Sequence, residues 1–245
     1  MYKGTNASDG IGIGTAVIVE EAELIITRRE VNDTEAEVQR FKGALETTIA
    51  ETQKMAEDLA ARVGEKEAEI MQGHMMLLSD PMLTGEIENS IQNDKVNSEF
   101  AIENVCNMYA DMFASMGDEL MQQRATDMRD IKVRMQRTLM GLQSVDVSAL
   151  PAGTILVAKD LTPSMTAGIN PANVTGIVTE LGGRTSHSAI LARALEIPAV
   201  VAVNGLLDEV KDGDTVVLDG SAGEVYVKSG GRGKGCLRSK ERAVF

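Results

Sequence analysis

The stretch GGRTSHSAILARALEIPAVV (Gly182–Val201) lies between two short apolar segments of the chain. Before it, residues 175–179 are rich in Thr, Val and Ile, and its own end leads into Ala199–Val203, so both segments predict strands. Between them, the run from Ser188 to Leu195 favours a helix. A strand, a helix and a second strand in this order indicate an α/β layer.

Further segments extend this layer in both directions along the chain. Thr154–Ala158 and Thr215–Leu218 predict strands, and Ser164–Gly168 predicts a short helix. A turn and a further strand are predicted from Gly10 to Glu20, and the Gly-x-Gly-x-Gly pattern at the start of this segment lacks the full dinucleotide-binding spacing. This early strand has no sheet of its own to join. We therefore expect it to pair with the later strands.

The intervening residues 33–141 have a helical pattern. Apolar residues recur at three- and four-residue steps, with one longer step, from Val38 to Val63, and Thr34 followed by Glu37 predicts a capping box at the start of this helix. Further helices are predicted over Glu65–Ser79, Met82–Asn93, Ser98–Ser115 and Glu119–Gly141.

The sequence therefore predicts an α/β domain with an inserted all-α helical bundle. The α/β subdomain is discontinuous and consists of residues 1–32 and 142–228, and the helical subdomain consists of residues 33–141. Residues 229–245 are Gly-rich and basic, and we expect them to form a disordered tail.

The composition limits the classes of function. The net charge is −13, although the last eighteen residues carry six Lys or Arg and one Glu, so the acidity lies in the rest of the chain. An acidic field repels nucleic acid and favours a basic protein partner, although it can also serve solubility alone. No apolar run reaches the length of a membrane span, the N-terminus lacks a signal-peptide pattern, and the two Cys have no metal or disulfide spacing. We expect a cytoplasmic protein.

His187 stands at the start of a predicted helix, after two glycines and a Thr-Ser pair. The glycines allow a tight turn and close approach of a substrate, Thr185 or Ser186 can cap the helix, and a helix start favours an anion. Arg184 adds a positive charge suited to a phosphoryl group or a carboxylate. A neutral imidazole is a nucleophile towards phosphorus. From the residues alone, an ordinary cap with a histidine that simply begins the helix stays equally open.

Two other residues have several possible roles. The hydroxyl of Thr166, at another predicted helix start, can hydrogen-bond an imidazole and fix its tautomer, but its spacing also suits a cap or a surface position. His74 lies among Met and Leu within a predicted helix, and we interpret it as a packing or interface residue. The Met-rich faces are interpreted as bundle core, and part of them as a partner surface.

The stretch Gly182–Val201 resembles the phosphohistidine signature of Enzyme I, the phosphoenolpyruvate–protein phosphotransferase of the bacterial sugar phosphotransferase system. The resemblance covers about Gly10 to Val227. This signature also resembles that of pyruvate phosphate dikinase and phosphoenolpyruvate synthase, but four other segments agree with Enzyme I in the same order: Gly10–Gly14, Gly73–Leu78, Arg124–Ile131 and Asp160–Ala167.

The resemblance implies an α/β phosphohistidine (swivelling) domain whose inserted helical bundle docks the phosphocarrier protein HPr. It implies that His187 receives a phosphoryl group on Nε2 from phosphoenolpyruvate and passes it to HPr, with Thr166 hydrogen-bonding His187.

The resemblance also implies an HPr-binding surface. It places Met76, Leu77 and Arg124 near HPr, and we add Glu67 for its charge.

The resemblance ends near Val227, whereas Enzyme I continues into a barrel domain that binds phosphoenolpyruvate and Mg²⁺ and dimerises. We therefore expect a monomeric fragment without a cofactor or metal, binding neither nucleic acid nor membrane, that exchanges phosphoryl reversibly with HPr but needs the missing domain to use phosphoenolpyruvate. Two alternatives remain. One is a non-catalytic HPr-docking module, and the other is the nitrogen-related Enzyme I paralogue with another carrier.

Overall fold

The computed structural model describes residues 1–20, 23–143 and 145–228. These residues form two compact units, each made of segments that are separate in the sequence. The α/β unit consists of residues 1–20, 145–161 and 168–228, and the helical unit consists of residues 23–143 and 162–167. The tail of residues 229–245, which the sequence predicts to be disordered, lies outside the described residues.

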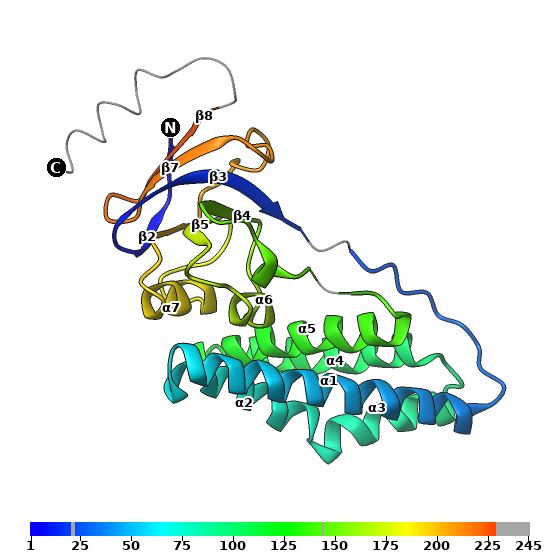
Figure 1. The fold of residues 1–245 in the computed structure, drawn as a ribbon. Helices are drawn as coiled ribbons and strands as arrows, with labels where there is room; N and C mark the ends of the chain where they lie inside the picture. Colours follow the sequence, from blue (N-terminus) through cyan, green and yellow to red (C-terminus); the bar gives the residue numbers. More distant parts are fainter. Residues whose placement is uncertain (21–22, 144, 229–245) are drawn as a thin grey trace, which may run out of the picture. The chain divides into compact units, whose positions relative to one another are not determined.

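The α/β unit contains one mixed sheet in which the described strands follow the order β1-β8-β7-β3-β4-β5-β6-β2 (Figure 1). Strands β3 to β6 are parallel neighbours, and the other pairings are antiparallel. The strands are β1 (Tyr2–Lys3), β2 (Thr5–Ser8), β3 (Ile11–Val19), β4 (Thr154–Ala158), β5 (Val174–Thr179), β6 (Ala199–Val201), β7 (Thr215–Asp219) and β8 (Glu224–Lys228).

The predicted N-terminal strand is confirmed as β3, which pairs with β4 on one side and with β7 on the other. Its glycines serve close packing, because a Cβ at Gly12 would lie 2.5 Å from the carbonyl oxygen of Thr175. Three short strands, β1, β2 and β8, are not predicted by the sequence analysis. They hold edge or near-edge positions, where a few residues pair without a long apolar pattern.

The helical unit contains the five predicted long helices and one short helix from a later segment (Figure 1). They are α1 (Thr34–Arg62), α2 (Glu65–Leu78), α3 (Pro81–Asn93), α4 (Ser98–Ser115), α5 (Glu119–Met140) and α6 (Pro163–Ala167). Gly141 ends α5 in the left-handed conformation with φ 66°, as predicted for a C-cap. The apolar stripes meet in one core that includes Phe41, Ile87, Ile102 and Ile131. The expected fold class, an α/β domain with an inserted helical bundle, is confirmed.

The predicted capping box at the start of α1 is wrong. Asp33, not Thr34, caps the helix by accepting a hydrogen bond from the backbone N–H of Ala36 at 3.0 Å. The carboxylate of Glu37 instead accepts hydrogen bonds from the Arg40 guanidinium at 2.7 Å and from the backbone N–H of Ser98 at 2.6 Å. Glu37 therefore serves a tertiary contact that local spacing does not reveal.

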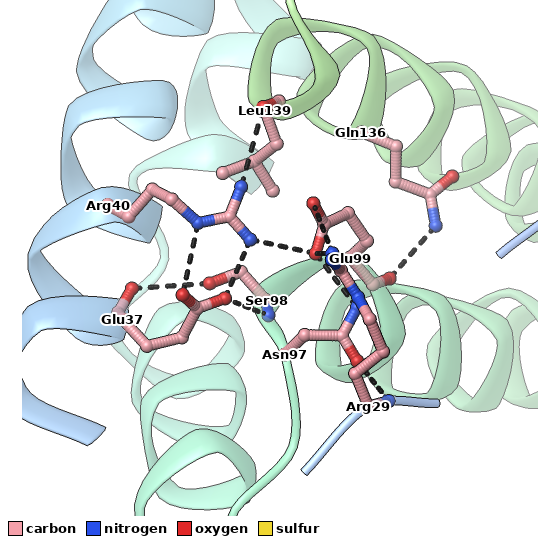
Figure 2. Close-up of polar contacts among 8 residues, drawn as sticks. All are labelled: Arg29, Glu37, Arg40, Asn97, Ser98, Glu99, Gln136 and Leu139. Carbon is pink, nitrogen blue, oxygen red and sulfur yellow. Dashed lines mark hydrogen bonds and ion pairs between the residues drawn. The ribbon is translucent and has the colours of Figure 1, made fainter. Parts of the chain in front are cut away.

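Arg40 lies at the centre of a polar cluster that joins α1 to the start of α4 (Figure 2). Its guanidinium donates to Glu99 at 2.8 Å, and the same carboxylate accepts from the Asn97 side chain at 2.8 Å. Burial alone would raise the pKa of Glu99, but the hydrogen bonds from Arg40 and Asn97 outweigh it and lower the pKa to about 2. The cluster is therefore ionised and stabilises the bundle at neutral pH.

The structure differs from the sequence prediction at three segments. Residues 23–32, 142–143 and 162–167, expected in the α/β subdomain, belong to the helical unit. For 162–167 the cause is a set of hydrogen bonds to bundle residues, because Asp130 of α5 accepts from Ser164 and Arg62 of α1 donates to Ala167.

Candidate functional site

His187 is the first residue of helix α7 (His187–Ala194) in the α/β unit, and it is half-buried. The chain leaves β5 at Thr179 and reaches α7 through a turn in which Gly182 has φ 97°. A residue with a Cβ is strained at this φ, so the first glycine of the pair is required by the turn. At Gly183 a Cβ would meet no described heavy atom within 4 Å, so this glycine leaves open space before His187.

Ser186 caps α7, as one of the two predicted caps. Its hydroxyl oxygen accepts from the backbone N–H of Ala189 at 3.3 Å, and its hydroxyl donates to the carbonyl of Gly183 at 2.8 Å. The Thr179 hydroxyl, at the end of β5, donates to the carbonyl of Leu181 at 2.6 Å. These bonds connect residues close in sequence, so the segment that presents His187 is shaped by its own neighbours.

Arg184 has an exposed side chain in the turn before His187. A guanidinium there, beside the first turn of a helix, suits an anionic ligand because helix N-termini present backbone N–H groups and a positive dipole end. The carbonyl of Arg184 accepts from the Arg193 guanidinium at 3.0 Å, and the same guanidinium donates to the carbonyl of Ala7 at 2.8 Å. Arg193 therefore ties the turn to β2. The sequence analysis missed it, because its partner in β2 lies 186 residues away.

Asp160 is a second residue that the sequence analysis missed. It follows β4, which is the parallel neighbour of β5, so the segments after both strands leave the sheet at the same edge. Loss of solvation raises the pKa of the Asp160 carboxyl, while a hydrogen bond from the N–H of Leu161 and the charge of His187 oppose the rise. Asp160 is thus an acidic group within electrostatic reach of His187. Asp160 could have been identified as a candidate site residue, because it begins the segment Asp160–Ala167 that agrees with Enzyme I.

Thr166 lies in α6, in the helical unit, and not in the unit that contains His187. It is the fourth of five helical residues rather than a helix start, and it is buried. Its hydroxyl donates to the carbonyl of Pro163 at 2.9 Å, which leaves the oxygen able to accept. Its predicted role in orienting His187 stays a prediction.

Three of the four predicted partner-binding residues lie around Gly73 of α2. Met76 is 71% exposed, Leu77 is half-buried against the bundle core, and the Arg124 guanidinium packs onto Gly73 from α5. A Cβ at Gly73 would lie 2.6 Å from Nη1 of Arg124, so only glycine allows this contact. These residues form what is here called the Gly73 surface.

Glu67 does not belong to the Gly73 surface. Nine residues separate it from Met76, which places the two side chains on opposite faces of a helix with 3.6 residues per turn. Glu69 is exposed and lies seven residues before Met76, on the same face. Helical periodicity would have identified Glu69 as the acidic residue beside Met76.

His74, the second histidine, is fully buried within the helical unit, as the packing interpretation predicts. Its Nε2 lies 3.3 Å from a carboxylate oxygen of Asp127, and its Nδ1 lies 3.7 Å from a carboxylate oxygen of Asp130. Both carboxylates belong to α5 and are buried. The sequence analysis did not identify these partners.

The described residues contain no group of three or more His, Cys, Asp or Glu side chains able to hold a metal ion. Among the same residues, no helix has the length and apolar character to cross a membrane.

Comparison with known proteins gives a consistent family. The family model of the N-terminal part of phosphoenolpyruvate-utilising enzymes matches residues 3–124, and that of their mobile domain matches residues 150–223. The phosphoenolpyruvate-protein phosphotransferase of Listeria monocytogenes is 44% identical over 92% of this chain, and that of Bacillus subtilis is 41% identical over 92%. The chain spans 39% and 40% of the length of these two relatives.

Two solved structures cover the whole chain. An NMR structure of Enzyme I (nEIt) is 38% identical with a TM-score of 0.83, and the chain covers 99% of it. The N-terminal domain of Enzyme 1 - Nitrogen is 25% identical with a TM-score of 0.62, again with 99% of that chain covered.

Proposed function

The chain belongs to the Enzyme I family of phosphoenolpyruvate-utilising enzymes, and we propose that it carries a phosphoryl group on His187 and exchanges this group with HPr. The observation that carries the proposal is the position of His187 as the first residue of α7, after a glycine turn and a serine cap. A nucleophile at a helix start lies where backbone N–H groups and the helix dipole stabilise the charge of a phosphoryl group.

The transfer is a displacement at phosphorus. The lone pair of Nε2 of neutral His187 attacks the phosphorus of phospho-HPr, a nitrogen–phosphorus bond forms on His187, and the bond to the donor histidine breaks with its electron pair returning to that ring. The His187 ring releases its N–H proton to solvent and the donor ring takes up one proton, so both imidazoles are neutral after the transfer. The reverse step regenerates phospho-HPr. Arg184 and the first-turn N–H groups of α7 stabilise the transferred oxygens, and the Thr166 hydroxyl orients the imidazole by a hydrogen bond.

The helical unit provides the docking surface for HPr in this proposal. The Gly73 surface combines exposed apolar area at Met76 with the charge of Arg124 and, on the same face, of Glu69. Flexible methionines adapt to a partner's surface, and the acidity of the chain favours a basic partner. Further exposed methionines follow one face of α4 and its C-cap at positions 108, 112 and 116.

In this proposal, phosphorylation of His187 from phosphoenolpyruvate requires the part of the longer relatives that lies outside the matched region. The curated relatives are more than twice as long as the matched region. We therefore propose that the described part exchanges phosphoryl with HPr in the cytoplasm, as a monomer, and does not load itself from phosphoenolpyruvate.

The test is a labelling experiment with two donors. The protein is incubated separately with phosphoenolpyruvate plus Mg²⁺ and with phospho-HPr, and acid-labile, base-stable phosphate is located by mass spectrometry. We expect label from phospho-HPr on the peptide containing His187 and none on the peptide containing His74. His187→Ala should take no label. Absence of label from both donors contradicts the phosphocarrier role.

Two alternatives are separated by this experiment when the phosphorylated nitrogen-related carrier is added as a third donor. A non-catalytic docking module would bind HPr without taking label, and His187→Ala would change nothing. The nitrogen-related paralogue would take label from the nitrogen-related carrier in preference to HPr. The higher identity to Enzyme I, 38% against 25%, supports HPr as the partner.

A further inference from the structure

Helix α6, which carries Thr166, is held at both ends by residues of the bundle. At its start, the carboxylate of Asp130 accepts from the Ser164 hydroxyl at 2.8 Å and from the Ser164 backbone N–H at 3.1 Å. At its end, the guanidinium of Arg62 donates to the carbonyl of Ala167. An anion at the start and a cation at the end both complement the helix dipole. A five-residue helix is too short to be stable alone, so these contacts decide where it lies.

Asp130 is itself part of a buried polar chain. Asp130 is 4% exposed, and behind it lies His74, which is 0% exposed and contacts Asp127 on its other side at 3.3 Å. Asp127 in turn lies 3.7 Å from Nη1 of Arg124. This row of polar side chains therefore runs from Arg124 through Asp127, His74 and Asp130 to Ser164. All five residues lie within the helical unit.

This row of polar side chains connects the two features of the helical unit that the proposed function uses. Arg124 belongs to the Gly73 surface, and Ser164 lies two residues before Thr166 in α6. A buried row of polar and ionisable groups stabilises a protein less than apolar packing of similar volume, because desolvation opposes the attraction between its members. A row of this kind is useful where it fixes one geometry, because each buried polar group restricts where its neighbours can lie.

We propose that Asp130 and His74 are positioning residues of the phosphoryl-transfer site. Asp130 holds α6, and with it the Thr166 hydroxyl, in one fixed place within the helical unit, and His74 packs behind the Asp130 carboxylate at 3.7 Å. This inference rests on the proposed function, because Thr166 acts on the phosphohistidine. The helical unit then supplies both a docking surface and a group that orients the nucleophile.

The first test is Asp130→Ala, compared with Asp130→Asn and with Asp111→Ala as a control. Asp111 lies in α4, its side chain is 82% exposed, and it is 3.9 Å from Arg129 of α5, so its loss leaves α6 intact. For Asp130→Ala we expect a rate of phosphoryl exchange at saturating phospho-HPr that is about tenfold lower or more, with unchanged affinity for HPr. Asp130→Asn keeps one acceptor and should recover part of the rate. His74→Gln should lower the rate in the same way but less.

The second test is amide hydrogen exchange at Thr166, whose backbone N–H donates to the carbonyl of Thr162 at 3.0 Å. Asp130→Ala should accelerate this exchange about tenfold or more and leave the central amides of α4 unchanged. In a Thr166→Val background, Asp130→Ala should cause no further loss of transfer rate, because both changes remove the same contribution.

The outcomes separate this inference from the proposed function. Unchanged protection of the Thr166 amide in Asp130→Ala overturns the positioning role, whatever the transfer rate. A wild-type rate in Asp130→Ala, or full additivity with Thr166→Val, also overturns it while leaving phosphoryl exchange on His187 in place. If the wild-type protein takes no phosphate from phospho-HPr, the proposed function fails and this inference fails with it.

Discussion

The two units of the molecule organise their polar groups in different ways. In the α/β unit, the segment that presents His187 is shaped by contacts within a few residues, such as those of Ser186 with Gly183 and Ala189. In the helical unit, the polar groups that fix the architecture find partners far along the chain, as Arg40 finds Glu99 and Ser164 finds Asp130. The conformation of a segment that presents a site residue can therefore be determined by neighbouring residues, while the helices of the other unit are held together by residues far apart in the sequence.

The α/β unit also contains one long-range polar contact near His187. Arg193 of α7 bonds both the Arg184 carbonyl nearby and the Ala7 carbonyl in β2. The turn before His187 thus also has one long-range anchor. The substitutions below measure how large the difference between local and long-range contacts is.

The largest effect is expected for Glu99→Gln, which removes the buried charge facing Arg40. Because the change leaves Arg40 with one carboxylate fewer in a nearly buried cluster, we expect the free energy of unfolding to fall by about 3 kcal/mol in urea denaturation. Glu88→Gln is the control. Its partner Lys42 is half-exposed, and the Lys42 Nζ lies 3.1 Å from the Glu88 carboxylate. Loss of this ion pair should change the free energy of unfolding by less than about 1 kcal/mol. Equal effects of the two changes would contradict the importance of the Arg40 cluster.

The same cluster predicts an acid dependence. The pKa of Glu99 is lowered from 4.5 to about 2, and that of Glu37 is also lowered, so the folded state binds these protons less readily than the unfolded state. Their stabilisation is present above pH 4.5 and is lost as the pH falls towards about 2. We expect the loss to be on the order of 2 kcal/mol, measured by denaturant unfolding across this range. Glu99→Gln should flatten the dependence of the free energy of unfolding on pH. If the slope in this variant equals that of the wild type, other carboxylates cause the acid dependence.

Gly182→Ala tests the local side of the comparison. The residue has φ 97°, so a Cβ strains the backbone, and we expect a loss of about 1–2 kcal/mol. Gly183→Ala should change stability by less than about 0.5 kcal/mol, because its Cβ enters open space. Thermal unfolding of the two variants side by side measures the difference, and a larger effect at Gly183 would refute the assignment of the turn.

Ser186→Ala removes the cap of α7. We expect a loss of about 1 kcal/mol, because the N–H of Ala189 loses its acceptor. Thr185→Ala, which alters the neighbouring hydroxyl that does not cap the helix, should remain within about 0.5 kcal/mol of the wild type. If Thr185→Ala has the larger effect in chemical denaturation, the cap has been assigned to the wrong residue.

The smallest net effect is expected for Gly73→Ala. Replacing glycine by alanine inside a helix usually stabilises by up to about 1 kcal/mol, and Gly85→Ala in α3, where a Cβ meets nothing within 4 Å, should show this gain. At Gly73 the displacement of Arg124 should cancel it and also weaken HPr binding in calorimetry. A full gain in stability with unchanged HPr affinity would show that Arg124 moves without consequence.

The periodic elements and the turn before His187 could be predicted because their signals are local. The apolar stripe of α1, the break before Pro81 and the C-cap at Gly141 all depend on residues within a few positions of one another. The Thr-Ser pair before His187 indicated a cap for the same reason. The Glu37 capping box failed because a carboxylate three residues into a helix can as well bond a distant backbone N–H.

The helices, the central strands and the position of His187 at a helix start can be predicted from the amino-acid sequence, because they follow from propensity and periodicity among neighbours. The completion of the sheet by β1, β2 and β8 and the place of α6, with Thr166, in the helical unit depend on contacts that only the folded chain brings together. The same holds for the position of His74 between two buried carboxylates. Short edge strands and a five-residue helix are not stable alone, so the partners that the folded chain brings to them determine where they lie.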